Sequence, residues 1–266
     1  MNEPLNILGL EVDHLSFQQA IQKVKELGFA RMSSYVCFAN VHMVIEAYRN
    51  KNFAKQVNAA TLVLADGQPL TKLSRILYRK TQERIPGMDF MPKLLEAINS
   101  ENFKIFLYGS NEKVLDALQL KIKQKYKLVE IAGAISPPFR KLSGIELNDH
   151  VNTINSSGAH IVFVSLGCPQ QEKWMFENHK KIGAVMLGVG GAFSVTAEIH
   201  KRAPLWMQEN SLEWLFRLLC EPRRLFKRYF LTNAMFIWLM SKELIKNKLW
   251  TLFIRSGNPV GQEMKN

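Results

Sequence analysis

The chain has 266 residues, of which 35 are lysine or arginine and 23 are aspartate or glutamate, so its formal net charge is +12. With 47% hydrophobic and 22% charged residues it can bury a sizeable core, which excludes global disorder. Three cysteines are too few and too scattered for a disulfide scaffold or a zinc site with paired ligands. We therefore expect one large domain, or one domain with an appendage, in a reducing compartment.

Short apolar runs, rich in β-branched and aromatic residues, alternate with amphipathic stretches over the first 195 residues. The apolar runs show little alternation, which is typical of strands buried on both faces. The pattern predicts an α/β, Rossmann-like fold with a mostly parallel sheet and helices on both faces. The predicted strands are 35–39, 61–65, 104–108, 161–166 and 184–189. The predicted helices include 16–27, 43–57, 90–98 and 112–125.

Glycine or aspartate follows several predicted strands directly, at Asp66, Gly109, Gly167 and Gly190. Any one of these turns is explained by the need of α/β proteins for glycine there. Several on one sheet edge favour a ligand site, because open α/β sheets bind ligands at the carboxyl ends of their strands. The chain has neither a G-x-G-x-x-G nor a P-loop motif, so no dinucleotide or NTPase fingerprint is present.

The sequence changes character after about residue 200. Residues 201–266 hold twelve basic and five acidic residues, a net +7, which implies an anionic partner. We expect a helix over 212–220, an interruption at Pro222, a helix over 223–241 and an apolar patch over 249–254. No apolar run reaches the roughly 18 residues of a spanning helix. Interleaved aromatic residues and cations suit a helix in a membrane interface, and a helix pair packed on the core is the alternative.

A set of short motifs carries a resemblance to a known family. In chain order they are Asp66-Gly67, Glu83 to Asp89, Gly167 to Glu172, Gly188 to Phe193, Lys201 to Pro204, and Leu212 to Leu218 followed by Glu221 to Tyr229. Each motif is weak alone, but their order and spacing are specific. From about residue 5 to about residue 230 the chain resembles the WecG/TagA/CpsF family of bacterial glycosyltransferases, glycosyltransferase family 26.

The resemblance implies an inverting, metal-independent enzyme that moves a sugar from a UDP-sugar to a polyprenyl-diphosphate-linked sugar. The sugar would be N-acetylmannosamine, its uronic acid or a related hexose, for teichoic acid, enterobacterial common antigen, capsule or exopolysaccharide. The resemblance divides the chain into a catalytic core, 1–200, and a basic amphipathic appendage, 201–266, that docks peripherally on the cytoplasmic face of the inner membrane and completes the active site. It implies no cofactor and leaves a homo-oligomer open.

Inverting transfer needs a base that takes the proton of the acceptor hydroxyl, and a carboxylate at a strand end can serve. Asp66 follows a predicted strand, and the resemblance places the base there. The alternative is that Asp66 caps the next helix.

The leaving diphosphate needs positive charge, which many transferases supply with a metal ion on an Asp-x-Asp pair. None of the five aspartates is spaced that way. Fixed arginines match phosphate geometry instead. Arg217, Arg224 and Lys227 have spacings of seven and three, so one helix would place them on one face unless Pro222 disturbs it. By resemblance these cations reach the active site, although Lys227 stands where arginine is common; a solvated basic face is the alternative. Further phosphate candidates are Lys201 and Arg202.

Several other residues are candidates for substrate binding. Gln171, a donor-site residue by resemblance, and Glu172 follow a Gly-x-Pro turn and can bind sugar hydroxyls, although Glu172 also suits a helix N-terminus. Arg84 and Asp89 bind substrate or pair with each other. Members of the family commonly have Thr-x-Asn after the second strand; here Phe38 replaces the threonine and Asn40 is kept. An acid that is common near Ser194 in the family is absent here, so recognition of the donor sugar can differ. Glycines that allow close backbone approach complete the set: Gly109, Gly190 and Gly191.

Two other function classes compete with the transferase. A charge of +12 with aromatic residues among cations also suits a nucleic-acid-binding module, but no recognised reader motif is present, so we expect no nucleic-acid partner. A non-catalytic companion subunit of a partner transferase is the other alternative. An Asp66→Asn substitution separates them, because only a transferase would lose turnover.

Overall fold

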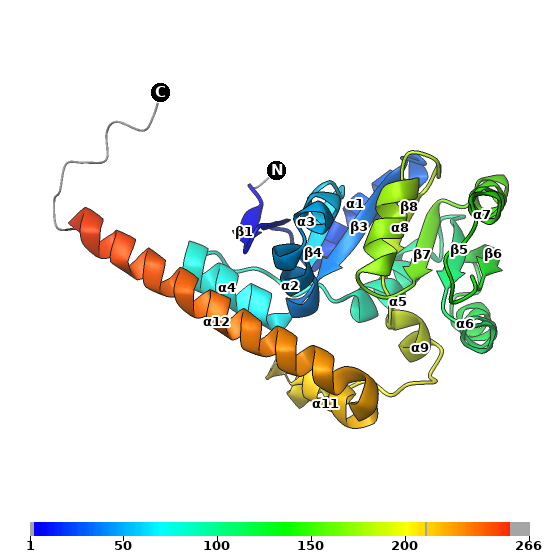
Figure 1. Cartoon of the computed structure of the whole chain (residues 1–266). Helices are drawn as coiled ribbons and strands as arrows, with labels where there is room; N and C mark the ends of the chain where they lie inside the picture. Colours follow the sequence, from blue (N-terminus) through cyan, green and yellow to red (C-terminus); the bar gives the residue numbers. More distant parts are fainter. Residues whose placement is uncertain (1–2, 211, 256–266) are drawn as a thin grey trace.

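The computed structural model describes residues 3–210 and 212–255 and has a six-stranded parallel sheet with strand order β4-β3-β8-β7-β5-β6 (Figure 1). Its strands are β3 (Ser34–Ala39), β4 (Leu62–Ala65), β5 (Lys104–Gly109), β6 (Glu130–Ile135), β7 (Ile161–Ser165) and β8 (Val185–Gly188). A small antiparallel hairpin, β1 (Leu5–Ile7) and β2 (Leu10–Val12), precedes them. The predicted α/β class is confirmed, and so are the five predicted strands.

Strand β6 is the element of the sheet that the apolar pattern does not reveal. It reads Glu-Ile-Ala-Gly-Ala-Ile and lies at the edge of the sheet, where its residues are half-buried or exposed. By contrast, β3 and β8 inside the sheet are buried at every position, and so is β4 at the opposite edge, which contacts β2 of the hairpin. An edge strand that is left partly exposed needs no continuous apolar run, so the small residues of β6 give little signal.

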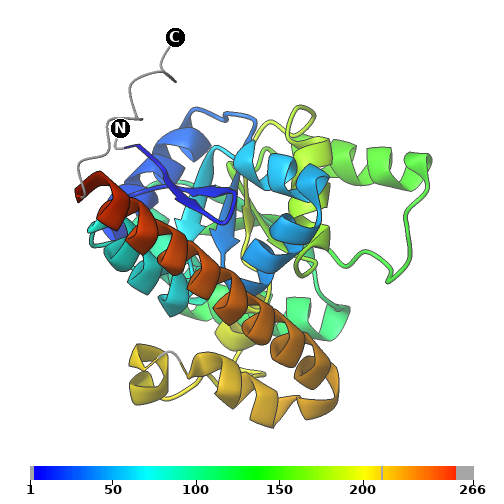
Figure 2. The same cartoon turned by 60° about the vertical axis from the view of Figure 1, so that its left-hand side comes forward.

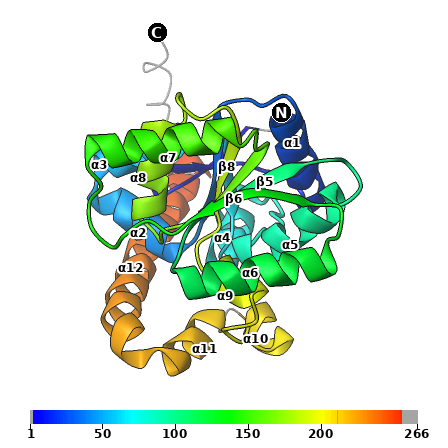
Figure 3. The same ribbon diagram turned by 90° about the vertical axis from the view of Figure 1, so that its right-hand side faces the viewer.

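Helices cover both faces of the sheet, as predicted (Figure 3). One face is covered by α1 (Phe17–Phe29), α5 (Gly87–Ile98), α6 (Glu112–Lys125) and α9 (Ala192–Thr196). The other is covered by α2 (Val41–Arg49), α3 (Lys51–Asn58), α7 (Gly144–Ser156) and α8 (Gln170–Asn178), with α4 (Gln68–Tyr78) packed into the same cluster.

The prediction of one helix over 43–57 is wrong, because Asn50 divides it into α2 and α3. Asn50 has an extended backbone with φ −128° and ψ 101°, and it ends α2 and begins α3. Its side-chain oxygen accepts hydrogen bonds from the backbone N–H groups of Asn52 and Phe53. Asparagine competes with helical hydrogen bonds in this way, which favours a new helix start.

Parallel pairing brings the carboxyl ends of the strands to one edge, so the residues after β3, β4, β5, β7 and β8 lie there together. Gly109 ends β5 with φ +112°, and a Cβ atom built on it would lie 2.4 Å from the carbonyl oxygen of Ser165. Glycine is therefore required where β5 and β7 end side by side.

The C-terminal segment consists of α10 (Leu205–Glu209), α11 (Glu213–Cys220) and α12 (Pro222–Arg255). The expected end of the second helix at 241 is wrong, because α12 is continuous to Arg255. The expected interruption at Pro222 is confirmed: α11 and α12 are separate helices, so Arg217 does not share a helix face with Arg224 and Lys227. The cause is Pro222, which lacks an N–H and therefore begins a helix more readily than it continues one. Of Arg224 and Lys227 the structure describes the backbone in α12, and their side chains lie outside the described part.

Helix α12 packs on the core over part of its length. Phe236, Leu239 and Met240 are buried in the same apolar cluster as residues of α2, and α12 lies diagonally across the molecule in Figure 2, with α10 and α11 below it. Over the described residues, none of the helices combines the length and the apolar character that crossing a membrane requires. This segment is thus anchored to the core at the edge where the strands end.

Candidate active site

Asp66 lies at the carboxyl end of β4, beside the end of β3. Its backbone N–H donates to the carbonyl oxygen of Ala39 at 2.8 Å. The N-cap of α4 is Gly67, which makes no side-chain capping bond, so the alternative that Asp66 caps this helix is wrong. Asn40 accepts from the Met43 N–H at the start of α2 and also hydrogen-bonds the Asp66 side chain. The Asp66 carboxyl is therefore held at the edge of the sheet rather than used as a cap.

The environment of Asp66 raises its pKa to about 7. Burial is the main cause, and the nearby Glu213 carboxylate adds to it. Arg84, the Asn40 hydrogen bond and Arg217 act in the opposite direction. A carboxyl with a pKa near neutral can accept a proton efficiently near pH 7, which is the requirement for a general base.

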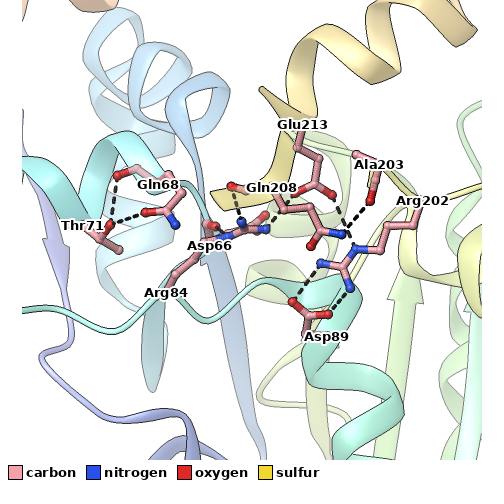
Figure 4. Close-up of polar contacts among 9 residues, drawn as sticks. All are labelled: Asp66, Gln68, Thr71, Arg84, Asp89, Arg202, Ala203, Gln208 and Glu213. Carbon is pink, nitrogen blue, oxygen red and sulfur yellow. Dashed lines mark hydrogen bonds and ion pairs between the residues drawn. The ribbon is translucent and has the colours of Figure 1, made fainter. Parts of the chain in front are cut away.

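Arg84 connects the turn after β4 to the C-terminal segment (Figure 4). Its Nε donates to the backbone oxygen of Asp66 at 3.0 Å, and its Nη1 donates to the backbone oxygen of Gln208 at 3.2 Å. Its Nη2 forms an ion pair of 2.7 Å with Oε2 of Glu213. Arg84 thus ties α10 and α11 to the end of β4.

Asp89 in the first turn of α5 makes a second connection to the C-terminal segment. Both of its carboxylate oxygens accept from Arg202, whose Nη2 lies 2.8 Å from Oδ2. The Nε of Arg202 lies 3.7 Å from Oε1 of Glu213. The alternative that Arg84 pairs with Asp89 is therefore wrong: each pairs with a residue beyond position 200. The sequence pattern could not reveal this, because the pairing depends on how the last segment folds back.

Arg217 reaches the strand ends from α11. A Cβ atom built on Gly191 would lie 3.0 Å from its Nη2, so the guanidinium rests against the bare backbone of this glycine. The neighbouring Gly190 has φ +49°, and its carbonyl oxygen accepts from the hydroxyl of Ser165 at 2.9 Å. The two glycines thus form a turn after β8 that leaves room for the arginine.

Gln171 and Glu172 begin α8 and are both buried. Nε2 of Gln171 donates to Oε1 of Glu172 at 2.8 Å and to the carbonyl oxygen of Gly188 at 2.7 Å. Burial raises the pKa of Glu172 to about 7, and its Oε2 has no hydrogen-bond partner among the described residues. In this structure the Glu172 carboxyl orients the amide of Gln171 instead of opening to solvent.

The structure thus joins five of the candidate residues in one network: Asn40, Asp66, Arg84, Asp89 and Arg202. Two more, Arg217 and Gly191, lie against each other beside it. Lys201 is exposed and makes no ion pair with a described residue. Sequence reasoning missed Glu213 and Gln208; the four-residue spacing of Glu213 and Arg217, which places both on one helix face, was the available signal. Among the described residues, no cluster of three or more potential ligand side chains is placed to hold a metal ion.

Similarity to known proteins identifies the family of this chain. The glycosyl transferase WecG/TagA/CpsF family matches residues 5–249. The chain belongs to this family. Within the WecG/TagA/CpsF family, it is similar to the N-acetylglucosaminyldiphosphoundecaprenol N-acetyl-beta-D-mannosaminyltransferases of Staphylococcus aureus strains NCTC 8325 / PS 47 and MRSA252, at 29% identity over 227 residues. Each alignment covers 83% of this chain and 86% of the relative.

The extent of the family match includes the C-terminal segment. It runs through α10 and α11 and most of α12, beyond the limit near residue 230 that the motifs indicate. The resemblance to WecG/TagA/CpsF glycosyltransferases is therefore confirmed. Glu213 and Arg217 of α11 lie within the matched region of this glycosyltransferase.

Proposed function

We propose that this glycosyltransferase moves N-acetylmannosamine, its uronic acid or a related hexose from a UDP-sugar to a polyprenyl-diphosphate-linked sugar in the synthesis of a cell-surface polysaccharide. The observation that carries the proposal is Asp66, a half-buried carboxyl with a pKa of about 7 at the strand ends, with Arg217 brought to the same edge. The activity for which the Staphylococcus aureus relatives are named supports the lipid-linked acceptor.

The chemistry follows from these two side chains. Asp66 accepts the proton of the acceptor hydroxyl as its oxygen attacks the anomeric carbon. The bond from that carbon to the diphosphate breaks, and UDP leaves with the electron pair. Attack from the side opposite the leaving group inverts the anomeric configuration.

Arg217 is the fixed cation suited to the leaving diphosphate. It forms no ion pair with a described residue, whereas Arg84 and Arg202 are already held by carboxylates. A guanidinium fixed before the reaction stabilises negative charge as it develops. Activity should therefore survive EDTA; complete loss that Mg²⁺ restores would contradict the role of a fixed cation.

The exposed face of α12 supports a peripheral position on the cytoplasmic face of the inner membrane. Large apolar side chains lie on this face with basic ones beside them, and Nζ of Lys242 lies 3.7 Å from the ring centre of Trp238. The exposed apolar residues are Phe226, Phe230, Leu231, Ile237, Trp238 and Ile245. Aromatic and basic residues on one helix face suit the interface of an anionic bilayer.

The test offers a panel of UDP-sugars together with lipid-diphosphate-linked N-acetylglucosamine and scores product and anomeric configuration. Asp66→Asn should lower turnover about a hundredfold or more while UDP binding is kept, because asparagine cannot act as the base but has nearly the same shape as aspartate. The exposed Asp116→Asn is the matched control. Full activity of Asp66→Asn would refute the base. Salt-dependent RNA binding with no UDP binding would favour the nucleic-acid alternative. Stimulation of a partner enzyme without any need for UDP would favour the companion-subunit alternative.

A further inference from the structure

Helix α11 presents two charged side chains to the strand ends from one face. Glu213 and Arg217 are four residues apart, so they project from the same side of the helix. Arg217 lies against Gly191, and Glu213 contacts Arg84 and Arg202. The two contacts of Glu213 therefore lie on the face of α11 that also carries Arg217 to the strand ends.

Both partners of Glu213 are themselves fixed to the core. Arg84 is held by the backbone oxygen of Asp66, and Arg202 by both oxygens of Asp89 on α5 (Figure 4). The side chains of Glu213 and Arg84 are 21% and 14% exposed, so this pair is shielded from solvent more than an ordinary surface pair. Such an arrangement holds a helix more firmly than a solvated ion pair would.

The same carboxylate balances the positive charge around Asp66. The charged groups that act on Asp66 are Arg84 before α5 and Glu213 and Arg217 on α11, with the Asp89–Arg202 pair next to them. Glu213 opposes the two arginines, because its negative charge favours the protonated form of Asp66. Without it, only the burial of Asp66 would oppose the effect of Arg84 and Arg217 on this carboxyl.

We propose that Glu213 is a positioning residue of the transfer reaction: it clamps α11 to the core through Arg84 and Arg202, and thereby places Arg217 and balances the charge around Asp66. This role rests on the proposed function. It gives the two halves of the site, the base on the core and the cation on the C-terminal segment, a shared anchor. The site is then assembled when α11 is docked.

The test is Glu213→Gln, followed by kcat and kcat/KM against pH. We expect kcat to fall about tenfold or more, because a loosened α11 misplaces Arg217. The acid limb of the profile should move to lower pH by roughly half a unit or more, because Arg84 and Arg217 then favour the ionised base. Glu209→Gln, which removes an exposed charge from the neighbouring α10, should change neither quantity.

Glu213→Asp separates charge from reach. It keeps the negative charge but shortens the side chain, so the acid limb should stay near its wild-type position while kcat falls. A lower kcat for Glu213→Gln with an unmoved acid limb would mean an ordinary structural contact and would overturn the proposal. An unchanged kcat would overturn it as well.

A second measurement is independent of turnover. Hydrogen exchange of the α11 amides should become faster in Glu213→Gln while exchange in the core strands is unchanged, because the clamp is lost but the sheet is not. Unchanged exchange in α11 would overturn the clamp. If the wild-type protein turned over no UDP-sugar, the proposed function would fail, and the exchange result would still decide whether Glu213 holds α11.

Discussion

At the scale of single residues, two carboxyls with similarly raised pKa values have different surroundings. Asp66 is half-buried and faces Arg84, Glu213 and Arg217, whereas Glu172 is fully buried and contacts Gln171. The first can exchange protons with a bound ligand, and the second cannot reach one without movement. A raised pKa alone therefore does not distinguish a catalytic base from a structural acid. The exposure of the carboxyl and the charged groups around it make the distinction.

The buried Glu172 should make stability depend on pH. Its pKa rises from 4.5 to about 7 on folding, so in that window the folded state holds a proton that the unfolded state releases. The free energy of unfolding therefore falls as pH rises through the window, by up to about 3 kcal/mol from this group. In Glu172→Gln this fall should be smaller. Urea unfolding at pH 5 and pH 8 measures it, with exposed Glu177→Gln as a charge control; an equal fall in wild type and Glu172→Gln would contradict the burial of an ionisable acid.

The sequence predicted the site residues unevenly, for a physical reason. Asp66 and Asn40 directly follow predicted strands, so local pattern and parallel topology were enough to place them together. The partners of Arg84 and Asp89 lie more than a hundred residues away in the chain. Such pairing depends on how α11 docks, which no local period encodes, and Glu213 was missed for the same reason.

At the scale of elements, α12 has two apolar faces with different surroundings. Phe236, Leu239 and Met240 pack on the core, while Ile237 and Trp238 are exposed on the other side. A helix that is apolar on several sides has no clear period, which is why the sequence favoured a break near residue 241. Packing on the core, one of the two alternatives for this segment, is therefore confirmed for part of α12, and the membrane interface stays a prediction for its exposed face.

Neighbouring residues on α12 provide a matched test of its packing. Phe236 is 7% exposed and Ile237 is 66% exposed. Phe236→Ala should lower the free energy of unfolding by about 3 kcal/mol, because it leaves a cavity against α2. Ile237→Ala should change it by no more than about 0.5 kcal/mol, since it removes no packed atoms. Thermal and denaturant unfolding measure both, and equal effects would show that α12 is not anchored as described.

At the scale of the whole molecule, the +12 charge and the exposed face of α12 predict binding to anionic vesicles. Replacing both Phe230 and Trp238 with glutamate should weaken binding about tenfold or more, because two large apolar contacts are lost and negative charge is added. Phe29→Glu is the control: this side chain is 78% exposed but ends α1, before β3 begins, at the opposite edge of the sheet.

Salt and lipid composition separate the two contributions to this binding. Raising salt from 0.1 to 1 M shortens the screening length from about 10 to about 3 Å, so binding to vesicles with anionic phosphatidylglycerol should weaken steeply. Binding to neutral phosphatidylcholine vesicles should be weaker at the start and nearly independent of salt, since only the apolar contacts remain. Co-sedimentation measures both. Equal binding of wild type and the Phe230→Glu/Trp238→Glu protein would contradict α12 as the docking surface. The strand-end site, which lies beside α11, would then have to receive its lipid-linked acceptor from a membrane bound at another face of the molecule.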